Sequence, residues 1–236
     1  MNKILIIIPA YNEEENILNT YKSIEKYNTK YKTKYDVIVI NDGSVDGTQK
    51  ILKENKIPHI NLIHNLGIGG AVQTGYKYAY ENDYDITIQF DGDGQHDINY
   101  AKNLIKEIEN GYDMVIGSRF IEEKSKFKST KIRRMGINVI SFFIKLFTRK
   151  KIYDTTSGFR ACNKNIIKLF SSNYPTEYPE PISTVEVLKS GFRISEVAVE
   201  MKERTAGQSS IHTWKNVYYM INVVLSIIIV SIRRYK

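Results

Sequence analysis

The chain of 236 residues is long enough for one large domain, or for one domain with an appendage. Its 42% hydrophobic and 25% charged residues are ordinary for a globular protein that buries a core. A single cysteine excludes an internal disulfide framework and fits a reducing compartment. The apolar run at residues 4–8 is too short for a signal peptide, because a proline and three glutamates follow it. We therefore expect a first buried strand in a cytoplasmic protein.

The net charge of +8 is concentrated in one segment. Residues 119–151 contain eleven Lys or Arg and two Glu, so the rest of the chain is close to neutral. A basic excess confined to one segment predicts a docking surface for an anionic partner. Nucleic acid, anionic lipid and a phosphorylated substrate all meet this description, and composition does not choose among them.

Short apolar runs alternate with helical patterns in the first half of the chain. The predicted strands are residues 3–8, 36–41, 59–64, 86–90 and 114–117. The predicted helices are residues 13–27, 48–54, 70–82 and 98–110. Such alternation is typical of an α/β sheet built from crossover units, whose ligands bind at the carboxyl ends of the strands.

Polar or glycine-rich loops follow the first three predicted strands. Their sequences are PAYNEE at residues 9–14, NDGSVDGT at 41–48 and NLGIGGA at 65–71. Asp46 and Thr48 also suit helix capping, and that alternative stays open. The third loop lacks the phase of a dinucleotide-binding fingerprint, because Val72 stands where glycine or alanine is required. A glycine-rich helix start near a phosphate remains compatible with this loop.

The sequence FDGDGQHD at residues 90–97 brings three carboxylates together directly after a predicted strand. Asp91 and Asp93 are two residues apart on a glycine-containing turn, so both are able to point at one hard cation. Mg²⁺ fits, because it takes few protein carboxylates and leaves positions to water and substrate phosphates. A polar turn with solvated acids is the alternative. A calcium-binding loop is excluded, because His96 replaces the required glycine and Lys102 the bidentate Glu.

Two later segments combine apolar faces with basic flanks. The pattern at residues 131–151 predicts either a packed surface helix or a helix in a membrane interface, and we favour the membrane because the basic excess lies there. As a helix, residues 217–232 would extend roughly 24 Å, short of the ~30 Å hydrocarbon core. We predict an interfacial or partner-docking helix there. The remaining predictions are a polar turn at 154–160, helices at 163–170 and 182–190, a strand at 193–199, and loops at 174–181 and 204–210.

Seven motifs, in order, resemble those of the family 2 glycosyltransferases, and most of all the branch typified by dolichyl-phosphate mannose synthase and bacterial polyprenyl-phosphate sugar transferases. They are PAYNE at residues 9–13, NDGSVDGT at 41–48, NLG at 65–67, DGDGQH at 91–96, GSR at 117–119, SGFR at 157–160 and the loop at 204–209. The resemblance covers roughly residues 1–212. It implies a GT-A fold, a Rossmann-like mixed α/β sheet flanked by helices, here with amphipathic and C-terminal apolar helices.

The same resemblance implies roles for individual residues. The nucleotide sugar would be bound by Pro9, Tyr11, Glu13, Asp42, Gly67 and Asp91. Mg²⁺ or Mn²⁺ on the diphosphate would be held by Asp93 and Gln95. The acceptor phosphate would be received by Arg119, Arg133 and Arg204, with Arg134 as the alternative to Arg133. Catalysis would therefore depend on the two aspartates of the DGDG turn and on these arginines.

The resemblance also divides the chain by task. Residues 1–118 would bind the nucleotide sugar, residues 119–213 would bind the acceptor with a basic amphipathic helix, and residues 214–236 would associate with membrane or a partner. Many bacterial relatives carry two full transmembrane helices after the catalytic part, whereas this chain has one short segment. We therefore expect a peripheral protein on the inner face of the cell membrane, with a small membrane protein as a further partner.

The expected reaction is inverting transfer of a hexosyl or N-acetylhexosaminyl group, with a UDP-sugar as donor and polyprenyl (undecaprenyl) phosphate as acceptor. A lipid phosphate needs no general base, because its second pKa is about 6 and it is largely dianionic at neutral pH. A saccharide acceptor in cell-surface polysaccharide synthesis is the alternative, with Glu177 or Glu180 as the base. A basic nucleic-acid-binding protein is the non-enzyme alternative, and it leaves the acidic strand ends unexplained. We expect no nucleic-acid partner.

Overall fold

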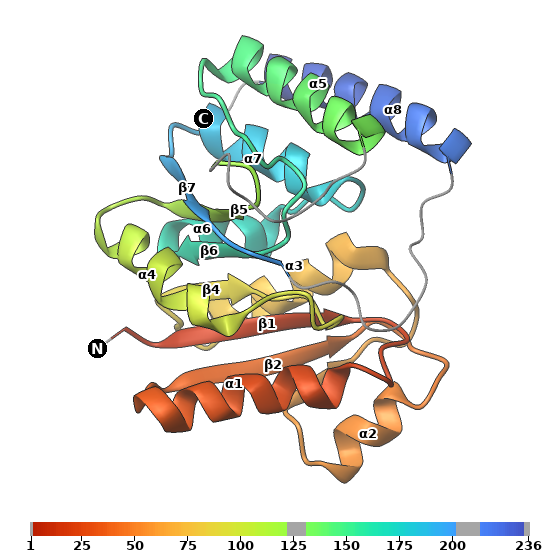
Figure 1. The fold of residues 1–236 in the computed structure, drawn as a ribbon, viewed down its shortest axis with the longest axis vertical. Coiled ribbons are helices and arrows are strands. Elements are labelled where there is room, and N and C mark those ends of the chain that lie inside the picture. Colours follow the sequence, from red (N-terminus) through yellow and green to blue (C-terminus); the bar gives the residue numbers. More distant parts are fainter. Residues whose placement is uncertain (1, 122–130, 202–212, 234–236) are drawn as a thin grey trace.

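The computed structural model describes residues 2–121, 131–201 and 213–233. The described strands form one mixed seven-stranded sheet in the order β3-β2-β1-β4-β6-β5-β7 (Figure 1). All of its neighbouring pairs are parallel except those of β6, which runs antiparallel to both β4 and β5. The strands are β1 (Ile4–Ala10), β2 (Tyr35–Asn41), β3 (His59–Asn61), β4 (Ile86–Gln89), β5 (Met114–Ser118), β6 (Arg160–Asn163) and β7 (Ile194–Ala198). The predicted mixed α/β sheet is confirmed.

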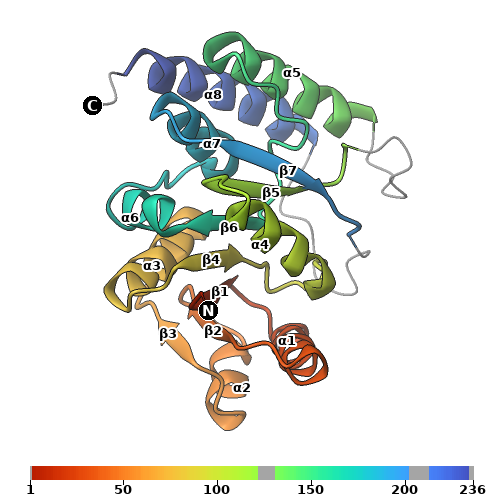
Figure 2. The same ribbon diagram turned by 90° about the vertical axis from the view of Figure 1, so that its left-hand side faces the viewer.

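Helices cover both faces of this sheet, as the edge-on view in Figure 2 shows. One hydrophobic core lies between the sheet and α1 (Ile17–Tyr31), α2 (Thr48–Glu54) and α4 (Ala101–Glu109). The other core lies between the sheet and α3 (Gly67–Glu81), α6 (Lys164–Ser172) and α7 (Pro179–Lys189). Because successive side chains of a strand point to opposite faces, β1 contributes Ile6 and Ile8 to the first core and Leu5 and Ile7 to the second. This burial on both faces explains the unbroken apolar run in β1.

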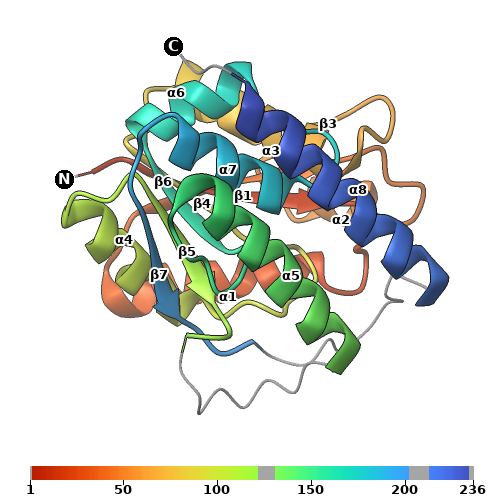
Figure 3. The same ribbon diagram turned by 90° about the horizontal axis from the view of Figure 1, so that it is seen from above.

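The helices α5 (Lys131–Thr148) and α8 (Thr213–Ile232) lie side by side as an outer layer over α7 (Figures 1 and 3). The inner face of α5 buries Ile140 and Ile144 in the second core. Its outer face exposes Met135, Phe142 and Leu146. The exposed apolar side chains of α8 are Ile221, Leu225, Ile229 and Ile232. The packed interpretation of residues 131–151 holds for the inner face of α5, and the membrane-interface interpretation stays a prediction for its exposed face.

No helix in the described part of the chain has both the length and the apolar character needed to cross a bilayer.

Three local predictions differ from the structure. The predicted turn at 154–160 continues directly into strand β6, which the sequence analysis missed because the strand is only four residues long and includes a buried Arg160. The predicted loop at 174–181 ends earlier, because α7 starts at Pro179 and proline is well tolerated in the first turn of a helix. The predicted helix at 98–110 is divided into a 3₁₀ turn, η1 (Ile98–Tyr100), and α4.

Candidate active site

A cavity of about 370 Å³ opens at the carboxyl ends of β1, β2 and β4. Parallel strands bring their carboxyl ends to one edge of the sheet, so the loops that follow them meet there. The lining includes every residue predicted to bind the nucleotide sugar, together with the predicted metal ligand Asp93; Gln95 is not part of it. The lining residues are Pro9, Ala10, Tyr11, Glu13, Asp42, Asn65, Gly67, Ile68, Ala71, Asp91, Gly92 and Asp93.

Hydrogen bonds tie the loop after β1 to the loop after β2. The Asn12 backbone N–H donates to Ser44 Oγ at 3.0 Å, and the Val45 N–H donates to Asn12 Oδ1 at 2.9 Å. The Glu13 N–H donates to Thr48 Oγ1 at 2.9 Å. Helix α2 has Gly47 at its N-cap, and Asp46 Oδ1 accepts the N–H of Thr48, the first residue of the helix, at 2.9 Å. The Thr48 hydroxyl therefore holds the neighbouring loop and places Glu13 at the cavity.

Asp42 connects the second loop to the third. Its Oδ1 accepts the Leu66 N–H at 2.8 Å, just before α3 begins at Gly67. Burial raises the pKa of Asp42 above its ordinary value, against the opposing effect of the Leu66 and Gly67 amides. Gly43 has a φ of +65°, and a Cβ there would lie 2.8 Å from backbone atoms of His64 and Asn65. The close approach of these two loops therefore needs glycine at residue 43.

Asp91 is fixed from two sides at the end of β4. Its Oδ2 lies 2.9 Å from His96 Nε2, and the His96 ring is stacked on Phe159 with 5.0 Å between ring centroids. A Cβ on Gly158 would lie 3.0 Å from both Asp91 carboxylate oxygens, so a larger residue there would crowd the Asp91 carboxylate. Burial alone would raise the pKa of Asp91, but His96 and, more weakly, Arg119 outweigh it and hold that pKa below its usual value. Asp91 therefore stays an anion beside the cavity.

Asp93 and Gln95 occupy the turn that follows. The Gln95 N–H donates to Asp93 Oδ1 at 3.0 Å, and Gly94 between them has a φ of +75°. Within the described ranges, no three His, Cys, Asp or Glu side chains gather into a metal cage. A cation bound mainly by substrate phosphates and water needs few protein carboxylates. The donor set of a carboxylate and an amide on one turn, with Asp93 at the cavity wall, fits a divalent cation held in that way.

Arg119 comes directly after β5 and forms a buried ion pair with Asp154. Its Nε and Nη2 donate to the two carboxylate oxygens of Asp154, each at 2.7 Å, and Nη2 also donates to Thr156 Oγ1 at 2.9 Å. Burial would raise the pKa of Asp154, but the hydrogen bonds and charge of Arg119 hold it below its usual value. The predicted acceptor-binding arginine is thus oriented by a partner that the sequence analysis did not single out.

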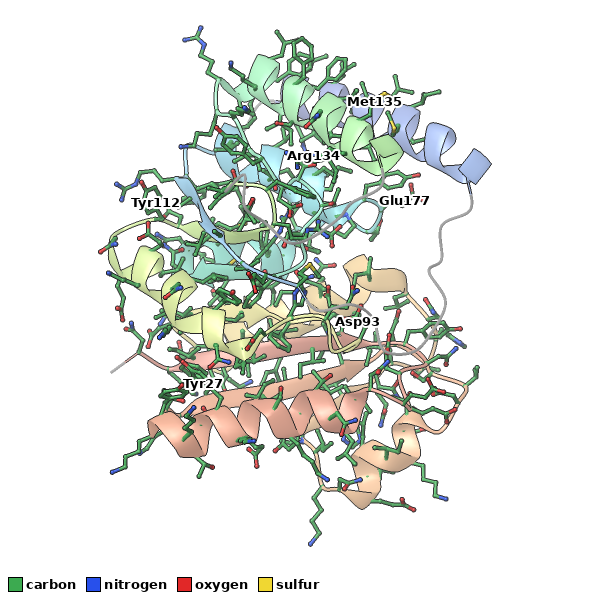
Figure 4. All side chains as sticks on the ribbon, viewed as in Figure 1. Tyr27, Asp93, Tyr112, Arg134, Met135 and Glu177 are labelled. Atoms are coloured by element: carbon green, nitrogen blue, oxygen red, sulfur yellow. The ribbon has the colours of Figure 1, made fainter. Side chains whose placement is uncertain are left out.

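A second arginine, Arg134, contacts the same aromatic ring as Arg119. The guanidinium carbon of Arg134 is 3.9 Å from the centroid of the Phe120 ring, and that of Arg119 is 5.3 Å from the same centroid. Arg134 Nη1 is buried and has no hydrogen-bond partner among the described residues. Figure 4 shows Arg134 above Asp93, which lies near the middle of the molecule in this view. The Arg133 side chain and the whole of Arg204 lie outside what the structure describes, so their predicted roles stay predictions.

The two candidate bases differ in their surroundings. Glu177 is exposed in the loop before α7, whereas Glu180 is half-buried in the first turn of that helix (Figure 4 labels Glu177). Burial raises the pKa of Glu180, while the charge of Arg160 opposes the shift. Arg160 is itself 1% exposed and donates from Nη1 to Ser183 Oγ at 3.0 Å.

Comparison with known proteins identifies the family of this chain. Residues 5–170, more than half of the chain, match the family described as Glycosyl transferase family 2. The chain belongs to this family. The resemblance found in its motifs is therefore confirmed, and so is its activity class, a glycosyltransferase.

Named relatives of this family 2 glycosyltransferase act on lipid phosphates. It is 33% identical to a UDP-N-acetylglucosamine–dolichyl-phosphate N-acetylglucosaminyltransferase of Methanococcus voltae, covering 84% of each chain. It is 27% identical to an undecaprenyl-phosphate mannosyltransferase of Micrococcus luteus, covering 88% of this chain and 86% of that one. The fold is similar to glucosyl-3-phosphoglycerate synthase of Mycobacterium tuberculosis, crystallised with Mn²⁺, UDP and phosphoglyceric acid. That likeness has a TM-score of 0.69 at 15% identity and covers 100% of this chain and 80% of the other.

Sequence reasoning missed several residues of this site. Asp154 and Gly158 stand in the polar turn, and only the pairing of β6 with β4 and β5 brings them to Arg119 and Asp91. His96 ends the DGDGQH motif, but the sequence analysis assigned it no role of its own. Its place five residues after Asp91 was the available signal, because a turn of that length lets the two side chains meet.

Proposed function

We propose that this glycosyltransferase moves a sugar from a UDP-sugar to a polyprenyl (undecaprenyl) phosphate, with inversion, at the cytoplasmic face of the membrane. The observation that carries the proposal is that one acidic cavity and a separate cationic group of two arginines lie beside the same sheet. Asp91 and Asp93 line the cavity, whereas Arg119 and Arg134 gather around Phe120 at the end of β5. The named relatives that act on dolichyl or undecaprenyl phosphate support the choice of acceptor.

The donor would be held by the loops after β1, β2 and β4. We assign the nucleotide to Pro9, Tyr11, Glu13, Asp42 and Gly67, which share the cavity wall with Asp91. Tyr11 is 45% exposed, so its ring is accessible to a flat base. Asp91, kept ionised beside His96, would face the donor. Residues 1–118 would thus form the nucleotide-sugar-binding half, and residues 119–213 the acceptor half within the same sheet.

We assign a divalent cation, Mg²⁺ or Mn²⁺, to Asp93 and Gln95. Breaking the sugar–diphosphate bond leaves negative charge on the nucleotide, and a bound cation stabilises that charge as it develops. The carboxylate of Asp93 would neutralise the cation on the protein side, and the Gln95 N–H keeps that carboxylate oriented. The structural relative with Mn²⁺ and UDP supports this assignment.

The acceptor phosphate would be bound by arginines. Guanidinium groups suit phosphate because they donate two parallel hydrogen bonds. Arg119 and Arg134 are the described candidates, and Arg133 and Arg204 keep their predicted roles. A lipid phosphate is largely dianionic at neutral pH and attacks the anomeric carbon without a base. The arginines therefore need to position the acceptor rather than deprotonate it.

The lipid tail would lie against the outer layer of the molecule. Met135, Phe142 and Leu146 on α5 and the four exposed residues of α8 form an apolar surface, which we call the outer apolar surface. Arg149, Lys150, Lys151 and Arg233 at the helix ends are exposed cations. Apolar area combined with cations favours binding to anionic lipid. We propose peripheral attachment through this surface, with a small membrane protein as a further partner of α8.

A saccharide acceptor is the second candidate, and Glu180 is the observation that favours it. A hydroxyl acceptor needs a base, and a carboxylate whose pKa is raised by burial is better suited to take a proton near neutral pH. Glu180 rather than the exposed Glu177 would then be that base. This alternative predicts loss of transfer in Glu180→Gln, whereas a lipid-phosphate acceptor predicts that Glu180→Gln keeps most of its activity.

The proposal is tested with purified protein, MnCl₂ and undecaprenyl phosphate in detergent. Radiolabelled UDP-N-acetylglucosamine, UDP-glucose and GDP-mannose are each supplied as donor, and butanol-extractable label is counted. We expect label in the lipid phase with a UDP-sugar. Label found only in added oligosaccharide would favour the saccharide acceptor. A gel shift with DNA or RNA, without any sugar transfer, would overturn the proposal in favour of nucleic-acid binding.

A further inference from the structure

Asp154 is the most deeply buried acidic residue next to the cationic group, with 0% of its surface exposed. It stands six residues before β6, and β6 runs antiparallel to β5. The segment that leads into β6 therefore returns to the carboxyl end of β5, where Arg119 follows Ser118. None of the expectations drawn from the sequence gave Asp154 a task.

Asp154 holds Arg119 by three hydrogen bonds. The Arg119 backbone N–H donates to Oδ2 at 3.0 Å, and the side-chain Nε and Nη2 donate to Oδ2 and Oδ1 at 2.7 Å each. Thr156 accepts a further bond from Nη2 at 2.9 Å. A bidentate pair supplemented by a backbone bond fixes both the position and the plane of the guanidinium. A flexible arginine on a loop would instead sample many rotamers.

Asp154 is itself held in place from the far edge of the sheet. Glu196 on β7 accepts the Tyr153 N–H at 2.8 Å and the Asp154 N–H at 2.9 Å. Three segments therefore meet here, namely the end of β5, the turn before β6, and β7. Glu196 therefore positions Asp154, and Asp154 in turn positions Arg119.

The orientation of Arg119 matters because Arg119 and Arg134 lie against the same aromatic ring. Both guanidinium groups contact the Phe120 ring. Asp154 neutralises the charge of Arg119, which leaves Arg134 as the cation of the two that has no carboxylate partner among the described residues. In binding a dianionic phosphate, Arg119 would then supply hydrogen bonds of fixed direction, and Arg134 would supply net positive charge.

We propose that Asp154, with Thr156 and Glu196, is a positioning residue that orients Arg119 for the acceptor phosphate. The inference rests on the proposed function, because it needs a phosphate acceptor. Asp154 does not touch the substrate; it acts through Arg119. If the Asp154–Arg119 ion pair were a structural clasp that only stabilised the fold, removing it would not weaken acceptor binding more than donor binding.

The test uses the whole chain and a pair of matched carboxylates. Asp154→Asn keeps the shape of the side chain and removes its charge. Asp113→Asn is the control: Asp113 stands just before β5, and it also joins neighbouring segments, by accepting the Asn163 Nδ2–H at 2.9 Å and the Arg193 N–H at 2.7 Å. Thr156→Val removes a single hydroxyl and tests the same clasp if Asp154→Asn does not fold.

Three quantities are measured for each variant: the melting temperature, the affinity for UDP in MnCl₂ by calorimetry, and the KM for undecaprenyl phosphate. We expect Asp154→Asn to raise that KM on the order of 10- to 100-fold, as small displacements of a positioning group do, with UDP affinity unchanged. Thr156→Val should raise it less, and Asp113→Asn should lower only the melting temperature.

The outcomes separate the inference from the proposed function. Unchanged KM for undecaprenyl phosphate in Thr156→Val and in folded Asp154→Asn would overturn the positioning role and leave a structural clasp. A loss of UDP affinity as large as the rise in the KM for undecaprenyl phosphate would also overturn it. Wild-type protein that transferred no sugar to undecaprenyl phosphate would overturn the proposed function, and the inference with it.

Discussion

The donor side and the acceptor side of this molecule are built in different ways. The cavity residues on the donor side lie in loops that follow β1, β2 and β4, and these loops contact one another directly. The acceptor side depends on residues brought together by an antiparallel strand, as Arg119 and Asp154 are. The first arrangement is a property of parallel strands in general, whereas the second depends on one particular strand, β6. Changes at Asp154 should therefore disable the acceptor side and spare the donor side, whereas changes at Gly158 would also reach Asp91.

The largest expected effect comes from Asp93→Ala on the donor side. Loss of electrostatic stabilisation of a leaving group lowers kcat on the order of 10²-fold or more, and EDTA should have a comparable effect on wild type. Asp97→Ala is the matched control, because Asp97 lies on the same turn and caps η1 by accepting the Asn99 N–H at 2.9 Å. That control should keep its kcat. Full activity of Asp93→Ala, or of wild type in EDTA, would remove the metal from the account.

Arg134→Ala should affect the acceptor side alone. A hydrogen bond to a charged group contributes about 1.5–3 kcal/mol, so the KM for undecaprenyl phosphate should rise roughly tenfold or more. UDP affinity measured by calorimetry should stay the same. Arg149→Ala removes an exposed cation from the other end of α5 and serves as the control. A loss of UDP affinity in Arg134→Ala would erase the distinction between the two sides.

Membrane attachment should respond to the exposed face of α5 and not to its buried face. Phe142→Ser with Leu146→Ser should reduce sedimentation with phosphatidylglycerol vesicles several-fold, more so after truncation before Val217, because attachment combines two weak signals. Phe143 and Phe147 pack against the second core, so Ser at those positions should lower the melting temperature instead. Unchanged vesicle binding by a folded Phe142→Ser/Leu146→Ser variant would show that the outer apolar surface is not the attachment site.

The smallest effect concerns stability in acid. The folded state lowers the pKa of Asp154, so this group stabilises the fold above its unfolded pKa of about 3.9, and the contribution is lost as the pH falls through the folded pKa. Each proton taken up changes the free energy of unfolding by up to about 1.4 kcal/mol per pH unit. Between pH 5 and pH 3, urea unfolding of wild type should lose more stability than that of Asp154→Asn. Equal losses would mean that Asp154 is not held ionised by Arg119.

The same comparison explains which features the sequence could predict. The loops with Tyr11, Asp42 and Asp91 follow buried strands, and parallel strands bring such loops together without further information. Strand β6 is short and contains Arg160, whose burial depends on Ser157 and Ser183, so local pattern gave no sign of a strand. Asp154 and Gly158 could not be assigned without it.

The outer helices illustrate a second limit. Periodicity predicted the helix at residues 131–151, but both of its faces carry apolar residues. Which face is buried depends on the contact with α7 and α8, and these helices are far away in the sequence. Periodicity alone therefore could not show that Phe143 and Phe147 pack against the second core, whereas Phe142 and Leu146 are exposed.

The most direct measurement of the central claim compares undecaprenyl phosphate with undecaprenol as acceptors for the same radiolabelled UDP-sugar, in the same detergent and with MnCl₂. A dianionic phosphate is recognised by arginines and needs no base, whereas an alcohol needs one. We predict butanol-extractable label with undecaprenyl phosphate and none above background with undecaprenol. Equal transfer to the alcohol, or transfer to neither lipid with any donor, would contradict the assignment of this glycosyltransferase to lipid-phosphate acceptors.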